Sequence, residues 1–320
     1  AQFGNRTPDT VMYEEVVEYF RGAASAEALN APWAYRQAIP WLAAQLPLSP
    51  WAGLAFVNLV GSLVGFVVLA VVYARILARP SQVYVALLLL IVSFPTVNFG
   101  SAALTEGGAY AFYALAFLSL VQRWWAAFIA TVVLGVAFRE TVLIAPFAAF
   151  LAGIQLRSLK MVGVALASCA ASLPLLWWLR QLPADAPAYV WKPAIDGLLQ
   201  NLSQPVSLLS MALTCVPLAV LYLYGQHAAQ PTRGSDGRGA LQRGMQPEHR
   251  VCCWAWILST SVLVSYSMLA AFMSGRFAWP AYVAACPLVA VALHDTPLSR
   301  RLLAPLAYLL FLAPCRQSGA

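Results

Sequence analysis

The sequence predicts an all-α, polytopic integral membrane helix bundle with about ten spans and amphipathic surface helices in its first outer loop. Of the 320 residues, 61% are hydrophobic and 10% are charged, and the mean hydropathy is +0.72. Soluble domains carry about 25% charged residues, so lipid is the expected solvent for most of this chain. The apolar residues also gather in runs near the length that crosses a bilayer, about 20 residues.

Ten apolar segments are candidate spans. Three of them, 124–138, 141–156 and 302–314, are shorter than the usual range of about 17–25 residues. The pair 124–156 is either two thin helices or a re-entrant hairpin, and in both cases its two ends lie on one side of the membrane. The predicted spans are 51–78, 83–99, 104–121, 124–138, 141–156, 161–179, 205–225, 251–273, 277–293 and 302–314.

Two regions between or before the spans have a different composition. Residues 9–50 are typical of amphipathic helices along the outer surface, with Thr10 as an expected N-cap and Gly22 as an expected helix end. Residues 226–250 are rich in Gly, Gln and Arg, which indicates a flexible linker. The predicted organisation is an extracytoplasmic loop at 1–50, transmembrane helices at 51–225, a flexible cytoplasmic loop at 226–250 and transmembrane helices at 251–320.

The distribution of charge orients the chain. With residues 1–50 outside, the inner loops hold eleven of the 19 basic residues and three of the 12 acidic ones. The opposite orientation would violate the excess of Lys and Arg in cytoplasmic loops. The basic residues assigned to the inside are Arg75, Arg79, Arg123, Arg157, Lys160, Arg233, Arg238, Arg243, Arg250, Arg300 and Arg301.

Several classes of function have no support in the sequence. The net charge of +7 comes without a dense basic run interleaved with aromatics, so we expect no nucleic-acid partner. The six cysteines lie in or beside apolar segments without zinc-ligand spacing, and we interpret them as packing residues. No P-loop, Rossmann fingerprint, HExxH or GxSxG motif occurs, so nucleotide chemistry and zinc-peptidase chemistry have no support. The chain opens with Ala1 in a polar stretch, and we expect an upstream span or cleaved signal.

Ionisable residues gather at the outer ends of the predicted spans. Charged groups near lipid are costly and are usually functional or paired. The candidate site residues are Asp9, Tyr13, Arg36, Glu106, Arg139, Glu140, Lys192 and Arg276.

Asp9 and Tyr13 are four residues apart and share one face of a helix. A carboxylate there can take a proton from an acceptor hydroxyl, or it can simply stabilise the helix N-terminus. Glu106 is suited to a metal ion or a sugar hydroxyl, or to pairing with Arg139. The Gly107–Gly108 pair that follows permits close helix packing.

Arg139 and Arg276 are candidate phosphate ligands. Arg139 and Glu140 lie in GVAFRETVLIAPF, between two apolar segments, and Arg276 lies in SGRFAWPAYVAACP. A guanidinium binds phosphate oxygens in a bidentate manner. The alternatives are local ion pairs or side chains that extend to the interface for Arg139, and capping of a helix boundary for Arg276.

In layout and in three short strings, the chain resembles the GT-C-fold glycosyltransferases, membrane enzymes that use polyprenyl-phosphate sugars. Asp9 in PDTVMY matches the family's acidic residue in the first outer loop, beside amphipathic helices. FRETVLIAPF resembles its Arg/Lys-Glu-Thr turn followed by Pro, and GRFAWPAYVAACPL resembles its late Arg-containing segment. The similarity is spread over residues 9–293.

The resemblance implies inverting sugar transfer from a polyprenyl-phosphate donor to an acceptor on the extracytoplasmic side. It implies Asp9 as the base, Arg139 or Arg276 as the residue that stabilises the leaving group, and Arg36 or Lys192 in reserve. The expected partners are membrane lipid and a polyprenyl-phosphate-linked sugar. The motifs require no cofactor. A divalent metal ion is the one cofactor whose use the motifs leave undecided. The expected location is a bacterial inner (plasma) membrane.

Two other functions compete with this one. A transporter or flippase for a lipid-linked or polar substrate would need polar residues near the middle of the membrane. Asn58 and Asn98 are the few such residues here. A non-catalytic membrane subunit would use the same charges only in ion pairs or partner contacts.

Overall fold

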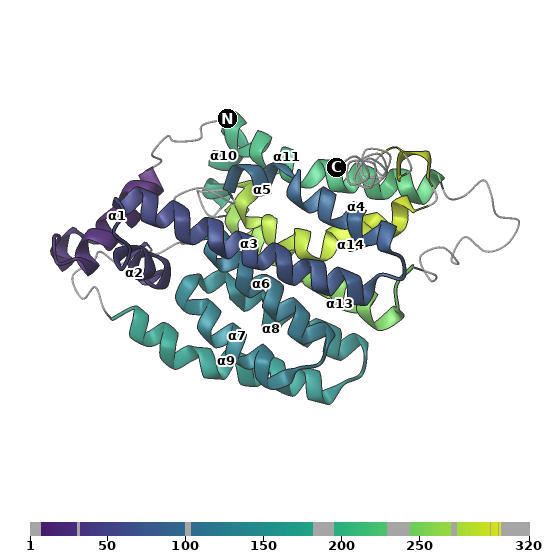
Figure 1. Ribbon diagram of the computed structural model, residues 1–320, viewed down its shortest axis with the longest axis horizontal. Helices are drawn as coiled ribbons and strands as arrows, with labels where there is room; N and C mark the ends of the chain where they lie inside the picture. The colour runs from purple at the N-terminus through teal and green to yellow at the C-terminus, as the bar shows by residue number, and fades with distance from the viewer. Residues whose placement is uncertain are drawn as a thin grey trace, which may run out of the picture.

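The computed structural model describes residues 8–30, 33–99, 104–181, 195–228, 244–269, 274–294, 296–299 and 301. Within these ranges the regular elements are helices, and one isolated bridge joins Leu77 to Met245 (Figure 1). In chain order the elements are α1 (Pro8–Phe20), η1 (Ala26–Ala28), η2 (Trp33–Tyr35), α2 (Ala38–Ala44), α3 (Pro50–Ile76), α4 (Pro80–Ile91), α5 (Phe94–Phe99), α6 (Glu106–Val121), α7 (Trp125–Phe138), η3 (Glu140–Leu143), α8 (Ile144–Gln155), α9 (Leu159–Leu179), α10 (Ile195–Ser203), α11 (Pro205–Ala228), α13 (Pro247–Leu269), η4 (Gly275–Phe277), η5 (Trp279–Ala281) and α14 (Tyr282–Leu293).

Five of the described helical segments are long and apolar enough to cross a membrane. They are α3, α9, α11, α13 and the stretch Gly275–Leu293. Four shorter apolar helices accompany them, and the whole set is compatible with an integral membrane protein. The prediction of about ten spans is not confirmed, and the predicted span 302–314 lies outside the described residues.

Within the described residues, one break and the short length of several helices account for the lower number. The predicted span 83–99 divides into α4 and α5, where the Ser93 hydroxyl bonds the Leu90 carbonyl and the Thr96 hydroxyl. The predicted pair 124–156 is two short helices joined by η3. The 14 residues of α7 span only about 21 Å, less than the hydrocarbon core of about 30 Å.

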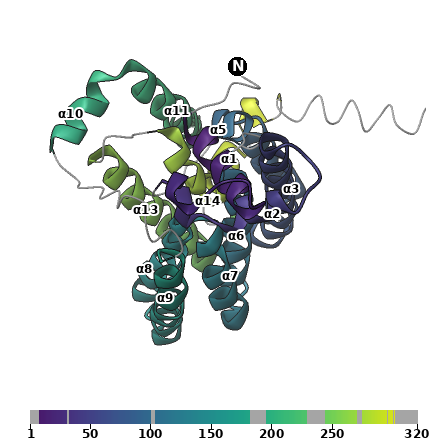
Figure 2. The same cartoon turned by 90° about the vertical axis from the view of Figure 1, so that its left-hand side faces the viewer.

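The centre of the bundle is formed by α6 and α14, whose residues are almost all buried. The long helix α3 packs closely on α6 because Gly61 faces Gly108, where a methyl group on Gly61 would lie 2.5 Å from the Gly108 Cα. The predicted close packing at this glycine pair is therefore present. By contrast, α11 and α9 lie at the periphery with many apolar side chains exposed, α11 on one side of the bundle and α9 on another (Figure 2).

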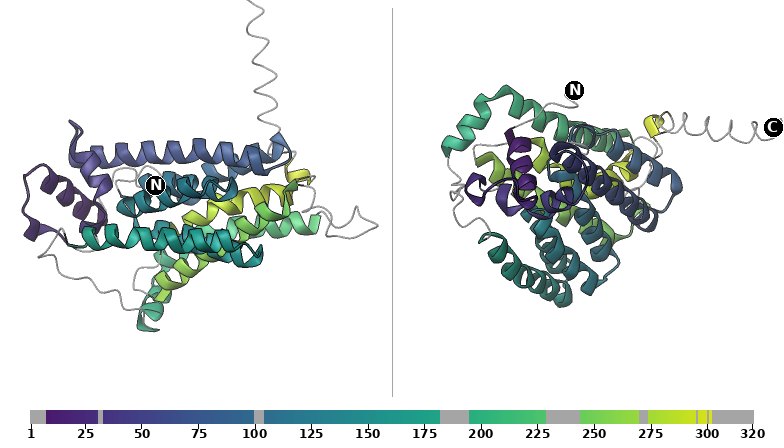
Figure 3. Two further views of the ribbon diagram at one scale, coloured as in Figure 1. Left: turned by 90° about the horizontal axis from the view of Figure 1, so that it is seen from below. Right: turned by 60° about the vertical axis from the view of Figure 1, so that its left-hand side comes forward.

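Two short helices, α1 and α2, cover one end of the bundle beside the start of α3 (Figures 1 and 3). The expected N-cap at Thr10 is wrong, because α1 begins at Pro8 and Thr10 lies inside it. Gly22 ends the helix region as expected, with a φ of +74° that suits glycine. Arg21 Nη2 donates to the carbonyls of Leu46 and Leu48, at 3.1 and 2.7 Å, and so fixes α1 to the segment between α2 and α3.

The opposite end of the bundle gathers basic residues. Arg75 contacts Gln122, Arg123 pairs with Glu248, and Lys160 lies over the Trp125 ring. The predicted linker 226–250 is helical at both ends, in α11 and α13. Residues 229–243 lie outside the described residues. Just before α13, Met245 is buried in the core, so the described end of this segment packs against the bundle.

Candidate functional site

The ionisable residues predicted at the outer span ends meet where α1 approaches α6, η3 and η4. They come from positions up to 267 residues apart in the chain. Asn58 fixes the start of α6, because its side chain donates to the Leu104 carbonyl at 2.5 Å and accepts from the Gly108 amide at 2.9 Å. This contact places Glu106 at the site. Asn58 is therefore a structural residue, and Asn98 is exposed.

The innermost contact joins Arg139 to Glu106. Arg139 Nη1 lies 2.5 Å from Glu106 Oε1, and both side chains are only 4% exposed. The same nitrogen donates to Thr105 Oγ1 at 3.1 Å, and the Thr105 amide donates to Glu106 Oε2 at 3.0 Å. A buried charge pair needs such additional hydrogen bonds to offset the cost of leaving water.

Arg276 extends this pair outward to Asp9. Its Nη1 lies 2.5 Å from Asp9 Oδ2 and 3.5 Å from Glu106 Oε1. The Arg276 and Asp9 side chains are 18% and 24% exposed, so this contact is more accessible than the inner pair. The neighbouring Gly275 fixes the backbone, because its amide donates to the Ser210 hydroxyl at 3.0 Å.

A third pair, Arg36–Glu140, lies beside the first two. Arg36 Nε donates to both carboxylate oxygens of Glu140, at 3.1 and 2.9 Å, and Arg36 Nη1 donates to the Tyr13 hydroxyl at 2.8 Å. The Tyr13 hydroxyl also lies 3.2 Å from Thr105 Oγ1, which connects this pair to the inner one. Burial disfavours the guanidinium charge, but Glu140 and Tyr13 outweigh burial and raise the pKa of Arg36.

The three pairs are electrically balanced. Three guanidinium groups face three carboxylates, so the formal charge of the site sums to zero. The described residues hold no cluster of three or more His, Cys, Asp or Glu side chains placed to hold a metal ion. The cations that contact the carboxylates in this part of the chain are arginines.

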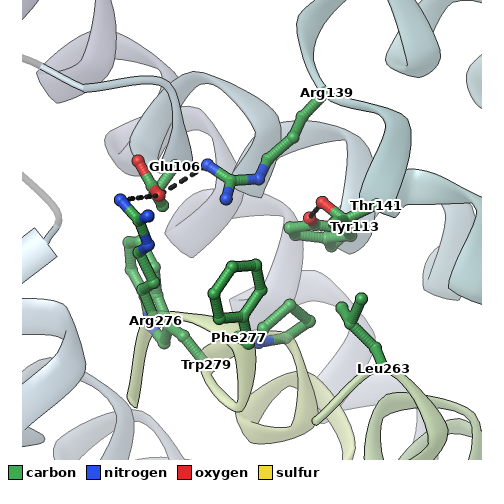
Figure 4. Close-up of a pocket in the computed structure, with 9 residues that line it drawn as sticks. Glu106, Tyr113, Arg139, Thr141, Leu263, Arg276, Phe277 and Trp279 are labelled. Atoms are coloured by element: carbon green, nitrogen blue, oxygen red, sulfur yellow. Dashed lines mark hydrogen bonds and ion pairs between the residues drawn. The ribbon is translucent and has the colours of Figure 1, made fainter. Parts of the chain in front are cut away.

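A small cavity of about 10 Å³ opens between the inner pair and η4 (Figure 4). Such a volume holds about one water molecule, so a larger ligand requires side chains to move. On one side of it stand Glu106, Arg139 and Arg276; the remaining lining residues are Tyr113, Thr141, Leu263, Phe277, Trp279 and Pro280.

The sequence pattern did not single out the hydroxyl pair Tyr113–Thr141, whose oxygens lie 2.5 Å apart in this cavity. One signal was available for each residue. Tyr113 lies two helical turns after Glu106, on the same face of the helix. Thr141 directly follows the Arg139–Glu140 pair in the sequence.

The structure brings together seven of the eight predicted site residues, namely Asp9, Tyr13, Arg36, Glu106, Arg139, Glu140 and Arg276. Lys192 lies outside the described residues. Their proximity is a geometric observation, and their chemical roles stay predictions. The alternative role of Arg139, local ion pairing, is also present, since Glu106 is its partner.

No protein-family model, curated protein or solved structure matches the chain. The function proposed below therefore rests on the site's own residues and on the resemblance in the short strings.

Proposed function

We infer that the protein is a membrane glycosyltransferase that moves a sugar from a polyprenyl-phosphate donor to an acceptor on the extracytoplasmic side. The observation that supports this most is the convergence of Asp9, Glu106, Arg139 and Arg276 at one end of an apolar bundle. A carboxylate beside two guanidinium groups provides both a proton acceptor and an anion-binding surface. Transfer of a sugar from a phosphate donor requires both a proton acceptor and an anion-binding group.

Arg276 and Arg139 would stabilise the leaving phosphate. As the bond between the sugar's anomeric carbon and the phosphate oxygen breaks, its electron pair stays on that oxygen. Guanidinium groups aimed at this developing charge lower the barrier because they are held in place beforehand. Phe277 lies beneath both arginines, with its ring centre 5.3 Å from the Arg276 Cζ and 5.9 Å from the Arg139 Cζ, and helps to hold them.

Asp9 would act as the base on the acceptor. The acceptor hydroxyl oxygen attacks the anomeric carbon from the face opposite the phosphate, and its proton passes to an Asp9 carboxylate oxygen. One carbon–oxygen bond forms as one breaks, and because the attack comes from the opposite face, the configuration at the anomeric carbon inverts. Asp9 is partly exposed, which is consistent with access for an acceptor from outside the bundle.

The proposed orientation follows the charge of the two ends. The end with Arg75, Arg123 and Lys160 would face the cytoplasm under the positive-inside rule. The end with α1 and α2 would then lie at the outer leaflet. Trp41, half-exposed on α2, suits the membrane–water interface.

The direct test is incubation of the purified protein with a panel of polyprenyl-linked sugars and detection of transferred sugar. Asp9→Asn should lower the rate by about 10²–10⁴-fold, because it removes a general base, while the protein remains folded. Glu27→Gln is a matched control: Glu27 is an exposed carboxylate on the same outer segment. Full transfer by the Asp9→Asn variant would remove Asp9 from the mechanism.

The same preparation separates the two alternatives. Uptake of a lipid-linked substrate into proteoliposomes without a covalent product would favour a transporter. Unchanged cellular function after combined replacement of Asp9, Arg139 and Arg276 would favour a non-catalytic subunit.

A further inference from the structure

Arg276 connects two carboxylates that differ in accessibility. Its Nη1 is 2.5 Å from Asp9 and 3.5 Å from Glu106. The Glu106 side chain is 4% exposed, whereas that of Asp9 is 24% exposed. An anion that approaches the site from outside therefore meets the Arg276–Asp9 contact before it meets the buried Arg139–Glu106 pair.

Arg276 also has donor capacity to spare. Its Nε is buried and makes no hydrogen bond to the described residues. A guanidinium has five N–H donors, and a phosphate accepts two of them side by side. The backbone beside Arg276 is held by the Gly275 amide, which donates to the Ser210 hydroxyl at 3.0 Å, and a methyl group on Gly275 would clash with Thr214 Oγ1. We therefore expect a change of anionic partner to involve the Arg276 side chain and not its backbone.

The charge balance indicates which carboxylate would give up its contact with Arg276 when a phosphate binds. Asp9 and Glu106 together balance Arg139 and Arg276, so an added phosphate gives the group an excess negative charge. Uncompensated charge in a poorly hydrated site is costly. Asp9 is the more exposed acid and lies in the first turn of α1, so water can hydrate its carboxylate at lower cost than that of Glu106.

We propose that Arg276 binds the phosphate of the lipid-linked donor in exchange for Asp9, so that donor binding releases Asp9 to accept the acceptor proton. This inference rests on the proposed function and deepens it. It makes Arg276 the first phosphate ligand, with Arg139 behind it. It also gives an order of events, because an acceptor that arrives first finds the carboxylate still bound to Arg276.

Binding measurements test this exchange without any transfer reaction. The protein is placed in phosphatidylcholine nanodiscs, and the affinity for a polyprenyl monophosphate is measured by calorimetry, with neutral polyprenol as the blank. Asp9→Asn should bind the phosphate about fivefold more tightly, because a competing partner is gone. Arg276→Gln should bind it more than about tenfold more weakly. Glu27→Gln, with the same change in charge, should match the wild type.

An Asp9→Asn affinity equal to or weaker than that of the wild type would overturn the exchange, as would the absence of phosphate binding by either protein. A parallel titration with inorganic phosphate identifies the ligand. If Asp9→Asn binds both inorganic phosphate and the lipid more tightly than the wild type does, the site recognises the phosphate group itself. If it binds only the lipid more tightly, the site recognises the lipid-borne phosphate.

The two proposals fail separately. Tightening in the Asp9→Asn variant without sugar transfer from any donor would end the glycosyltransferase proposal and leave the exchange standing. Sugar transfer by the wild type without tightening in the variant would end the exchange alone.

Discussion

The two ends of the bundle use the same kinds of residue in different ways. At the end covered by α1 and α2, Arg139 pairs with Glu106 and both side chains are 4% exposed. At the other end Arg123 pairs with Glu248, and these side chains are 57% and 56% exposed. Exposed pairs contribute little to stability, whereas a buried pair becomes very unfavourable when it loses one member. Pairing alone therefore does not mark the site; burial of the pairs does.

The largest effect on stability is expected from replacement of Glu106. Replacement by Gln leaves the Arg139 charge buried without its counter-ion, which should lower the free energy of unfolding by about 3–5 kcal/mol. Unfolding in SDS titrations of the detergent-solubilised protein measures this change. Glu248→Gln at the other end is the matched control. Equal losses in the two variants would contradict the distinction between the ends.

A smaller effect is expected at Glu140. Its side chain is 40% exposed while that of Arg36 is 9% exposed, so water partly screens the pair. Glu140→Gln should cost about 1–2 kcal/mol, measured in the same titrations. It should also loosen the Tyr13 hydroxyl, which Arg36 contacts at 2.8 Å. A cost as large as that of Glu106→Gln would show that burial does not rank the pairs.

Two arginines at the basic end, Arg123 and Arg157, have positive φ angles of 58° and 53°. The left-handed conformation costs a non-glycine residue about 1–2 kcal/mol. Arg157→Gly should therefore stabilise the protein by up to about 1 kcal/mol after the extra entropy of glycine is counted. Arg123→Gly should gain less, because it also removes the contact with Glu248. Destabilisation by Arg157→Gly would show that its side chain has a further role.

The smallest effect is expected at the exposed Arg123–Glu248 pair. Glu248→Gln should change the free energy of unfolding by less than about 1 kcal/mol. The change should shrink further in high salt, because exposed charges are screened. A double-mutant cycle with Arg123→Gln isolates the pair itself. A coupling above about 2 kcal/mol would place this end in the same class as the site.

The helical class and most helix positions follow from the apolar runs alone, because the requirement to satisfy backbone groups in lipid leaves few other solutions. The number of spans was not predicted, although the run 83–99 contains Pro95, which lies at the second position of α5 and favours a helix break before it. The site was found from charge placed at span ends. The Glu106–Arg139 pair was one of the alternatives that the sequence offered, whereas the contact of Asp9 with Arg276 was not predicted, because it joins positions 267 residues apart.

Conformation at single residues was the least predictable feature. Gly22 has the positive φ that its residue type suggests, whereas Arg123 and Arg157 have one that their type disfavours. In each case the turn closes by a backbone bond from the next residue, Trp124 to Ser119 and Ser158 to Gly153, both at 2.8 Å. These bonds close the C-terminal ends of α6 and α8 and offset the cost of the positive φ.

The close contact at Gly108 determines how α2 responds to the thickness of the bilayer. The side chain of Ile39 on α2 reaches so deep that a methyl group on Gly108 would lie 2.4 Å from its Cδ1. Helix α2 is thus anchored to α6 in the protein interior. Thinner or thicker bilayers should shift α2 and α6 together, so lipid thickness should leave the spacing between Asp9 and Glu106 unchanged.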